Sequence, residues 1–145
     1  RQYHVGTING VEYINDSKAT NVDAVFYALE AMEGKVIWIA GGTDKGNNYS
    51  PILELVRHKV RYLICLGVDN EKLKETFKNL FEEIFETQST HDAIGLASEL
   101  AKKGDSVLLS PACASFDMFT SYGHRGKEFV KEVQGLIGAS TAQTE

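Results

Sequence analysis

Long apolar runs, cysteines and an excess of basic charge are all scarce or missing in this 145-residue chain. No stretch approaches the roughly 18 consecutive apolar residues of a membrane span, so we expect no membrane as a partner. A basic segment followed by an apolar one, the pattern of a secretory signal, is also missing from the sequence. We therefore expect the protein in the cytoplasm.

The two cysteines, Cys65 and Cys113, lie far apart in the sequence. Cys65 belongs to the apolar run from Tyr62 to Leu66, which is typical of a buried, reduced thiol. Together with four scattered histidines, the cysteines do not give the ligand spacing of a zinc site, so we expect no metal site. No histidine lies near Cys113 in sequence to activate it, which argues against a nucleophilic thiol.

The formal net charge is −5 and no basic face is visible, so we expect no nucleic acid as a partner. Hydrophobic residues make up 43% and charged residues 24% of the chain, as in a soluble globular protein. The length corresponds to one domain with a sizeable core. Arg1 stands directly before a strand-like run without a starting methionine, so we expect an excised domain or a processed fragment.

Apolar runs that are typical of strands alternate with segments of helical periodicity. We expect strands over residues 3–8, 11–15, 36–40, 62–66, 84–88 and 106–109, and helices over 22–32, 50–59, 73–81, 93–100 and 127–137. Asn9-Gly10 predicts a hairpin between the first two strands, because both central positions of a type I′ turn need positive φ. Small polar residues follow from Gly138, so we expect a domain over 1–137 and a flexible tail over 138–145.

This alternation predicts an α/β fold with right-handed crossovers between parallel strands. We expect a Rossmann-like domain of three layers, in which helices cover both faces of a six-stranded, mostly parallel sheet. The opening hairpin adds one antiparallel edge strand. Ligands of such sheets bind at the carboxyl ends of the parallel strands.

Three polar loops follow expected strands, over residues 15–21, 41–46 and 110–115. The first loop leads from a strand into a helix, where backbone N–H groups and the helix dipole favour anions. Because all three loops follow strands, we expect them to open onto the same edge of the sheet. Their convergence predicts a binding site for a charged small molecule.

Two lysines in these loops, Lys18 and Lys45, can each meet a carboxylate or a phosphate. Thr20 can donate a hydroxyl hydrogen bond, or else Thr20 or Asn21 simply caps the following helix. Asp16 can accept hydrogen bonds from a ribose or orient Lys18, and its alternative is an ordinary turn role.

The other two loops leave similar alternatives. Residues 41–46 lack the spacer and the Lys-Ser/Thr pair of a Walker A motif, which excludes a nucleotide-hydrolysing P-loop. Ser115 and Tyr122, with the backbone N–H groups around Phe116, can bind a second carboxylate, or they mark a helix start. The basic cluster His124 to Lys127 is interpreted as a solvated helix start.

The most specific motifs are Asn15-Asp16-Ser17-Lys18-Ala19-Thr20-Asn21, Gly41-Gly42 with Asp44-Lys45, and Ser110-Pro111-Ala112-Cys113-Ala114-Ser115 followed by Asp117, Phe119, Arg125 and Gly126. Together these motifs resemble the C-terminal domain of the Mur ligases, most closely that of the members that add D-glutamate. The similarity spans Arg1 to about Leu136.

The resemblance implies a set of D-glutamate-binding residues, namely Lys18, Thr20, Lys45, Ser115, Phe116 and Tyr122. Thr20 and Lys45 would bind the α-carboxylate. Ser115 and the region of Phe116 and Tyr122 would hold the side-chain carboxylate. Arg1 and Asp16 would reach ATP across a domain interface. No catalytic residue is implied in this domain, which would position the amino-acid nucleophile.

The resemblance also implies a monomeric enzyme that joins D-glutamate to UDP-N-acetylmuramoyl-L-alanine in peptidoglycan synthesis, through an acyl phosphate. A central domain with a P-loop would bind most of the ATP and magnesium, so this chain alone would need no cofactor and would be inactive. The alternatives are another Mur-type ligase, folylpolyglutamate synthase, or a non-catalytic flavodoxin-like module. The Asp-Asn-Pro-Arg motif of the diaminopimelate- or lysine-adding ligases is missing from the sequence.

Overall fold

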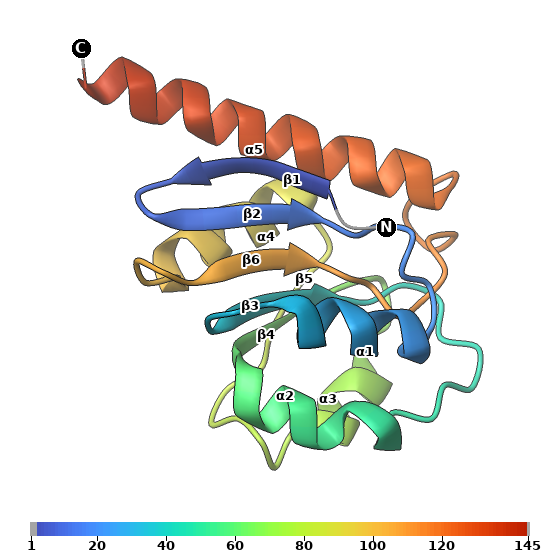
Figure 1. Ribbon diagram of the computed structural model, residues 1–145. Helices are drawn as coiled ribbons and strands as arrows, with labels where there is room; N and C mark the ends of the chain where they lie inside the picture. Colours follow the sequence, from blue (N-terminus) through green and yellow to red (C-terminus); the bar gives the residue numbers. More distant parts are fainter. Residues whose placement is uncertain (1–2, 145) are drawn as a thin grey trace.

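A six-stranded sheet forms the middle layer of the computed structural model, which describes residues 3–144 (Figure 1). The strands are β1 (Tyr3–Ile8), β2 (Val11–Asn15), β3 (Val36–Ala40), β4 (Val60–Leu66), β5 (Phe85–Thr87) and β6 (Ser106–Leu109). The helices are α1 (Val22–Ala31), the short 3-10 turn η1 (Ser50–Ile52), α2 (Leu53–Lys59), α3 (Glu71–Phe77), α4 (Thr90–Leu100) and α5 (Tyr122–Thr144). None of these helices, within the described residues, is long and apolar enough to cross a membrane.

The strand order is β1-β2-β6-β3-β4-β5. Only the β1–β2 pair is antiparallel, and the four remaining neighbouring pairs are parallel. Asn9 and Gly10 have φ values of 53° and 79°, as the type I′ hairpin turn between β1 and β2 requires. The predicted fold, a mostly parallel sheet of six strands with one antiparallel edge strand, is confirmed.

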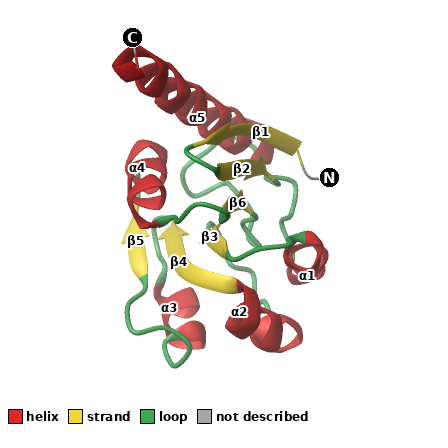
Figure 2. Cartoon of the chain, turned by 60° about the vertical axis from the view of Figure 1, so that its left-hand side comes forward, coloured by secondary structure: helices red, strands yellow, loops and turns green. Residues whose placement is uncertain are grey.

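Alternate side chains of the central strand β3 point into two different cores. Val36, Trp38 and Ala40 pack among residues of α1, α2 and α3. Ile37 and Ile39 pack on the other face, where α4 and α5 lie. Figure 2 shows these two groups of helices on opposite sides of the strands. The continuously apolar sequence of β3 follows from this burial on both faces.

Trp38 joins the core of the first face to the edge of the sheet that carries the polar loops. Its indole N–H donates a hydrogen bond of 2.7 Å to the carbonyl oxygen of Ser110. Its ring meets that of Phe77 edge to face, with 5.4 Å between the centroids. A buried indole therefore fixes the first residue after β6, where the third polar loop begins.

Several expected boundaries were wrong. Strand β4 begins at Val60 instead of 62, and α3 ends at Phe77 instead of 81 because residues 78–80 form a turn that still directs Leu80 toward the core. The last helix was expected over 127–137, but α5 begins at Tyr122, where the Ser121 hydroxyl accepts the N–H of His124.

The same helix continues to Thr144, past the end that we expected at 137. A glycine such as Gly138 costs only about 1 kcal/mol inside a helix, and no proline follows Pro111 to stop α5. Residues 138–144 are thus helical, whereas the domain limits 1–137 and the flexibility of residues 138–145 stay predictions.

Leu29 of α1 provides a test of the core, because its side chain is fully buried whereas that of the neighbouring Tyr27 is 68% exposed. We expect Leu29→Ala to lower the free energy of unfolding by about 2–5 kcal/mol, since it leaves a cavity in a packed layer. The matched control Tyr27→Ala should change it by less than about 0.5 kcal/mol. Urea unfolding followed by circular dichroism measures both, and equal losses would contradict the assigned orientation of α1.

Candidate functional site

The three polar loops meet at one edge of the sheet, where the parallel strands end (Figure 1). The first loop is bonded to the end of β6 and to the third loop. The N–H of Asp16 donates to the Leu109 carbonyl at 2.8 Å, and the N–H of Ala112 donates to the Ala19 carbonyl at 2.8 Å. Ala19 lies between Lys18 and Thr20, so these bonds hold both site candidates beside the third loop.

The second and third loops form a short antiparallel bridge between Thr43 and Ala114. The Thr43 N–H donates to the Ala114 carbonyl at 2.8 Å, and the Ala114 N–H donates back at 3.2 Å. This bridge brings the segment that contains Lys45 next to Ser115. The predicted convergence of the three loops is therefore confirmed in the geometry of the backbone.

Gly42 makes this close approach possible. Its φ of 135° lies in a region that side chains disfavour, and a Cβ atom at this position would collide with the Ala114 carbonyl oxygen. The glycine is thus required by the bridge.

Arg125, in the first turns of α5, ties all three loops together although only 2% of its surface is exposed. One guanidinium nitrogen donates to the Gly41 carbonyl at 3.2 Å. The second terminal nitrogen donates to the Cys113 carbonyl at 2.9 Å and to the Ser17 carbonyl at 3.4 Å. Our interpretation of residues 124–127 as a solvated helix start was thus wrong for Arg125.

Burial lowers the pKa of Arg125 to about 10, because removal from water disfavours its charged form. The pKa still lies well above neutral pH, so the guanidinium remains a cation. Its partners are carbonyl dipoles, and no salt bridge joins Arg125 to a carboxylate among the described residues. A positive charge therefore lies directly beneath the three loops, where it favours the binding of an anion.

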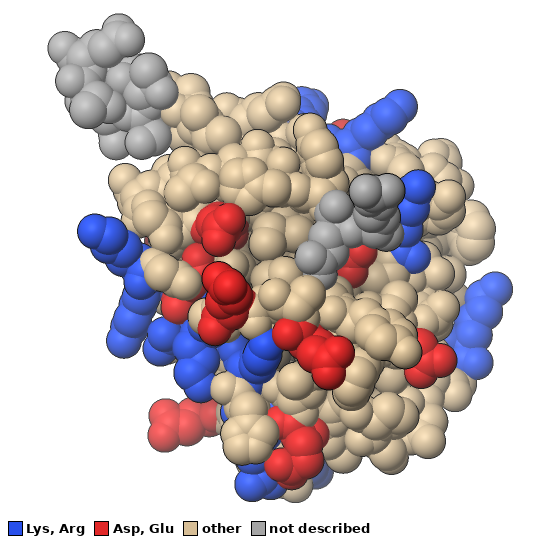
Figure 3. All heavy atoms as spheres, viewed as in Figure 1, with Lys and Arg blue, Asp and Glu red and all other residues tan. Residues whose placement is uncertain are grey.

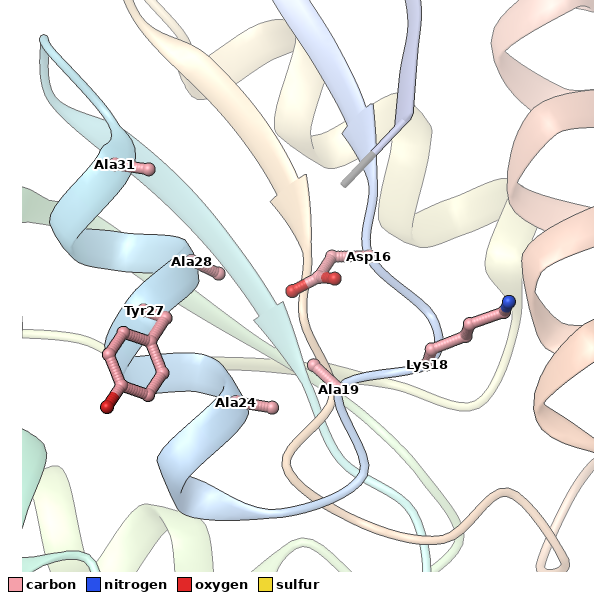
Figure 4. A pocket seen from close by; sticks show the side chains of 7 residues that line it. All are labelled: Asp16, Lys18, Ala19, Ala24, Tyr27, Ala28 and Ala31. Atoms are coloured by element: carbon pink, nitrogen blue, oxygen red, sulfur yellow. The ribbon is translucent and has the colours of Figure 1, made fainter. Parts of the chain in front are cut away.

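The two charged side chains of the first loop, Asp16 and Lys18, point in opposite directions. Figure 4 shows the Asp16 carboxylate turned toward α1 and the Lys18 ammonium turned away from it. The alternative in which Asp16 orients Lys18 was therefore wrong. Lys18 is exposed and lies beside both of two hollows, of about 530 and 370 Å³.

Asp16 is only 4% exposed, and one of its carboxylate oxygens accepts a hydrogen bond of 2.9 Å from the Ser110 hydroxyl. Burial raises the pKa of Asp16 above its usual value, although this hydrogen bond opposes the shift. The carboxylate lines the larger hollow together with Lys18 and the exposed Tyr27 (Figure 4). This combination provides an acceptor, a cation and an aromatic ring around a single concave surface.

The cap of α1 is Asn21, whose side-chain oxygen accepts the N–H of Ala24 at 2.9 Å. The alternative in which Thr20 caps this helix was therefore wrong. Thr20 is half-buried one residue before the cap, at the positive end of the helix dipole.

The remaining candidates differ strongly in exposure. Lys45 is exposed, Ser115 is 2% exposed, Phe116 is 68% exposed and Tyr122 is 46% exposed. Tyr122 and Lys18 line the smaller hollow, between the first loop and α5. Figure 3 shows basic side chains along the right-hand rim of the molecule, the side toward which the parallel strands run.

Arg1 lies outside the described residues. Within residues 3–144, no three His, Cys, Asp or Glu side chains are grouped so that they could hold a metal ion. Cys65 and Cys113 are both buried and neither forms a disulfide. Burial raises the pKa of Cys113, which further argues against a nucleophilic role.

A signal for the buried position of Arg125 was present in the sequence. Arg125, Phe129 and Val133 recur every four residues, and all three are almost fully buried. Gly126 is a second signal, because a Cβ atom there would collide with the Ser17 hydroxyl of the first loop. A charged residue at the start of an apolar stripe was read as solvated because arginine is seldom fully buried.

Comparison with known proteins supports these observations. The family model described as "Mur ligase, glutamate ligase domain" matches residues 1–113. The UDP-N-acetylmuramoylalanine–D-glutamate ligase of Christiangramia forsetii is 57% identical over 129 residues, which cover 89% of this chain and 29% of that relative. This chain thus corresponds to less than a third of the length of that relative.

Two solved structures share the fold at low sequence identity. A domain assigned to a UDP-N-acetylmuramate:L-alanyl-γ-D-glutamyl-meso-diaminopimelate ligase of Haemophilus ducreyi has a TM-score of 0.61 at 11% identity, covering 90% of this chain and 98% of that one. Escherichia coli FolC, solved in complex with ADP, has a TM-score of 0.53 at 20% identity, covering 90% of this chain and 30% of that one. With a family model that matches more than three quarters of its residues, the chain belongs to the Mur ligase family, as a glutamate ligase domain.

Proposed function

We propose that this chain is the amino-acid-binding domain of the ATP-dependent ligase that joins D-glutamate to UDP-N-acetylmuramoyl-L-alanine in peptidoglycan synthesis. The observation that carries the proposal is the meeting of three polar loops over the buried cation Arg125. The name of the relative from Christiangramia forsetii supports the choice of D-glutamate among the amino acids that such a site accepts.

The site residues have complementary roles in this proposal. Thr20 and Lys45 bind the α-carboxylate of D-glutamate, and Lys18 adds a second cation. Ser115 and the backbone beside Phe116 hold the side-chain carboxylate, with Tyr122 covering it. A ligand with two carboxylates suits a surface that has exposed lysines at its rim and a buried arginine below it.

Asp16 and Arg1 are proposed to contact ATP. The Asp16 carboxylate accepts hydrogen bonds from ribose hydroxyls, which suits its position in the wall of a hollow of about 530 Å³. ATP supplies the phosphoryl group that activates the carboxylate of the nucleotide sugar as an acyl phosphate. We propose that magnesium and most of the nucleotide are bound by the part of the ligase outside this chain.

The chain itself positions the nucleophile. Holding both carboxylates of D-glutamate fixes the direction of its amine toward the activated carbonyl carbon, which lowers the entropic part of the barrier. Without a Walker A loop, the chain alone is proposed neither to hydrolyse ATP nor to form the amide bond.

Lys45→Ala in the full-length ligase tests the assignment of the second loop. Loss of a charge-assisted hydrogen bond costs about 1.5–3 kcal/mol, so we expect the KM for D-glutamate to rise roughly ten- to a hundred-fold. The KM for ATP should stay within about two-fold, because Lys45 does not contact the nucleotide in this proposal. The control Lys78→Ala removes another exposed lysine, which forms an ion pair with Glu75 three residues earlier in the chain.

An equal rise of both Michaelis constants, or an unchanged KM for D-glutamate, would contradict the role of Lys45. The wild-type ligase should also use D-glutamate far better than D-glutamine, which lacks one of the two carboxylates. A preference for a neutral amino acid would overturn the proposed function itself.

Asp16→Asn gives a pH-dependent test of the buried carboxylate. A carboxyl group with a raised pKa in the folded chain contributes most to stability below its unfolded value, near 3.8, and loses this contribution as pH rises through the folded pKa. We therefore expect the free energy of unfolding of the variant, minus that of the wild type, to increase as the pH is raised from about 3.5 to about 7, the range that spans the titration. Urea unfolding at several pH values measures it, and a constant or falling difference would refute the raised pKa.

A further inference from the structure

A polar network holds the loop that contains Lys45, and the roles proposed above do not use this network. We propose that Asp44, Tyr49 and Lys72 are positioning residues that hold the Lys45 loop in the conformation that binds the amino-acid carboxylate. They act through Lys45 and do not touch the substrate. This inference rests on the proposed function, because it takes Lys45 as a ligand of that carboxylate.

Asp44 closes the turn that contains Lys45. One oxygen of its carboxylate accepts the N–H groups of Gly46 and Asn47, each at 2.9 Å. These bonds fix the backbone on both sides of Lys45. A lysine side chain loses considerable rotamer freedom on binding, so a backbone that is already fixed lowers the remaining entropic cost.

Tyr49 anchors Asp44 to the core. Its hydroxyl donates a hydrogen bond of 2.7 Å to the second carboxylate oxygen of Asp44. The tyrosine is only 3% exposed, and its ring meets that of Phe77 edge to face at 5.5 Å between centroids. Tyr49 thereby connects the loop to the buried core of the domain.

Lys72, from the first turn of α3, neutralises Asp44. Its ammonium lies 3.2 Å from the Asp44 carboxylate and donates to the Asn47 carbonyl at 2.6 Å. It also lies 5.7 Å from the centre of the Tyr49 ring. Because Lys72 balances the charge of Asp44, the Lys45 ammonium is left to attract the carboxylate of a ligand.

The hydrogen bonds also keep Asp44 ionised. Its burial opposes ionisation, but the bonds from the Asn47 amide, the Tyr49 hydroxyl, the Gly46 amide and Lys72 together lower the pKa of Asp44 below its usual value. The acceptor that closes the turn is therefore a carboxylate at neutral pH.

Asn47 extends the network to the third loop. Its side-chain amide donates to the Ala112 carbonyl at 2.9 Å and to the Tyr49 hydroxyl at 3.2 Å. The Tyr49 hydroxyl also lies 3.5 Å from the Cys113 sulfur. Loss of the Tyr49 hydroxyl should therefore loosen Lys45 relative to the loop that contains Ser115.

Tyr49→Phe in the full-length ligase is the first test, because it removes the hydroxyl and keeps the buried ring. We expect the KM for D-glutamate to rise by about three- to ten-fold, the effect of one hydrogen bond, with kcat and the KM for ATP within about two-fold. The control Tyr62→Phe removes the hydroxyl of a tyrosine in β4, and the ring of this tyrosine packs on Phe85. It should leave all three constants unchanged.

A second variant, Lys72→Met, tests the same network from the surface, where 44% of the lysine side chain is exposed and misfolding is not expected. Lys72→Met should also raise the KM for D-glutamate, whereas Lys78→Met should leave it unchanged. Each variant is also combined with Lys45→Ala. If both residues act through Lys45, they should add nothing to the effect of Lys45→Ala.

The outcomes separate the two proposals. A wild-type ligase that does not use D-glutamate would overturn the proposed function. A ligase that uses D-glutamate, but in which Tyr49→Phe and Lys72→Met leave its KM unchanged, would overturn only the positioning role. Full additivity with Lys45→Ala would also overturn it, because the network would then act by another route.

Discussion

The guanidinium of Arg125 donates hydrogen bonds to one backbone carbonyl of each polar loop, and these loops form the candidate site. Removing a cation from water is costly, and a pKa lowered to about 10 reflects that cost. The carbonyl dipoles offset it, and they in turn would lose their partner without the arginine. Loops and arginine thus depend on each other, and this contact adds to the backbone hydrogen bonds that join the three loops into one surface.

A second chain of contacts connects the same surface to the core. The buried indole of Trp38 fixes the Ser110 carbonyl, and the Ser110 hydroxyl holds the Asp16 carboxylate. In the second loop, Asp44 accepts a hydrogen bond from Tyr49, whose ring packs against that of Phe77 in the core. Buried side chains therefore connect the polar loops to the packed core, and a binding surface whose loops are held in place loses less entropy when a ligand binds.

The sheet and the edge that carries the site could be predicted from sequence because their signals are local and repeated. Apolar runs, the Asn9-Gly10 turn and the polar loops after three of the strands all indicated the same α/β architecture. The length of α5 was missed because the small polar residues from Gly138 onward were interpreted as a tail, although the helix continues through them to Thr144. The burial of Arg125 was missed for a different reason. Its spacing from Phe129 and Val133 indicated a buried position, but arginine is seldom fully buried, and no sequence pattern marks the backbone carbonyl groups that bind it here.

The network around Lys45 shows the same limit. Asp44 and Lys45 were recognisable as a polar pair, but the contacts of Asp44 with Tyr49 and Lys72 join separate elements of the chain. Side-chain identities alone indicate which groups are able to interact. The fold decides which of them meet.

The most direct test of whether one buried cation holds the site together is amide hydrogen exchange on this chain. The measurement compares the wild type with Arg125→Lys. The lysine keeps the charge but has one compact ammonium nitrogen in place of the planar guanidinium, whose two terminal nitrogens reach carbonyls in different loops. The amides of Asp16, Gly41, Thr43 and Ala112, which bond from one loop to its neighbour or to the end of β6, should then exchange faster together, while those of β3 and β4 keep wild-type rates. Faster exchange confined to α5, with the loop amides as protected as before, would contradict the account.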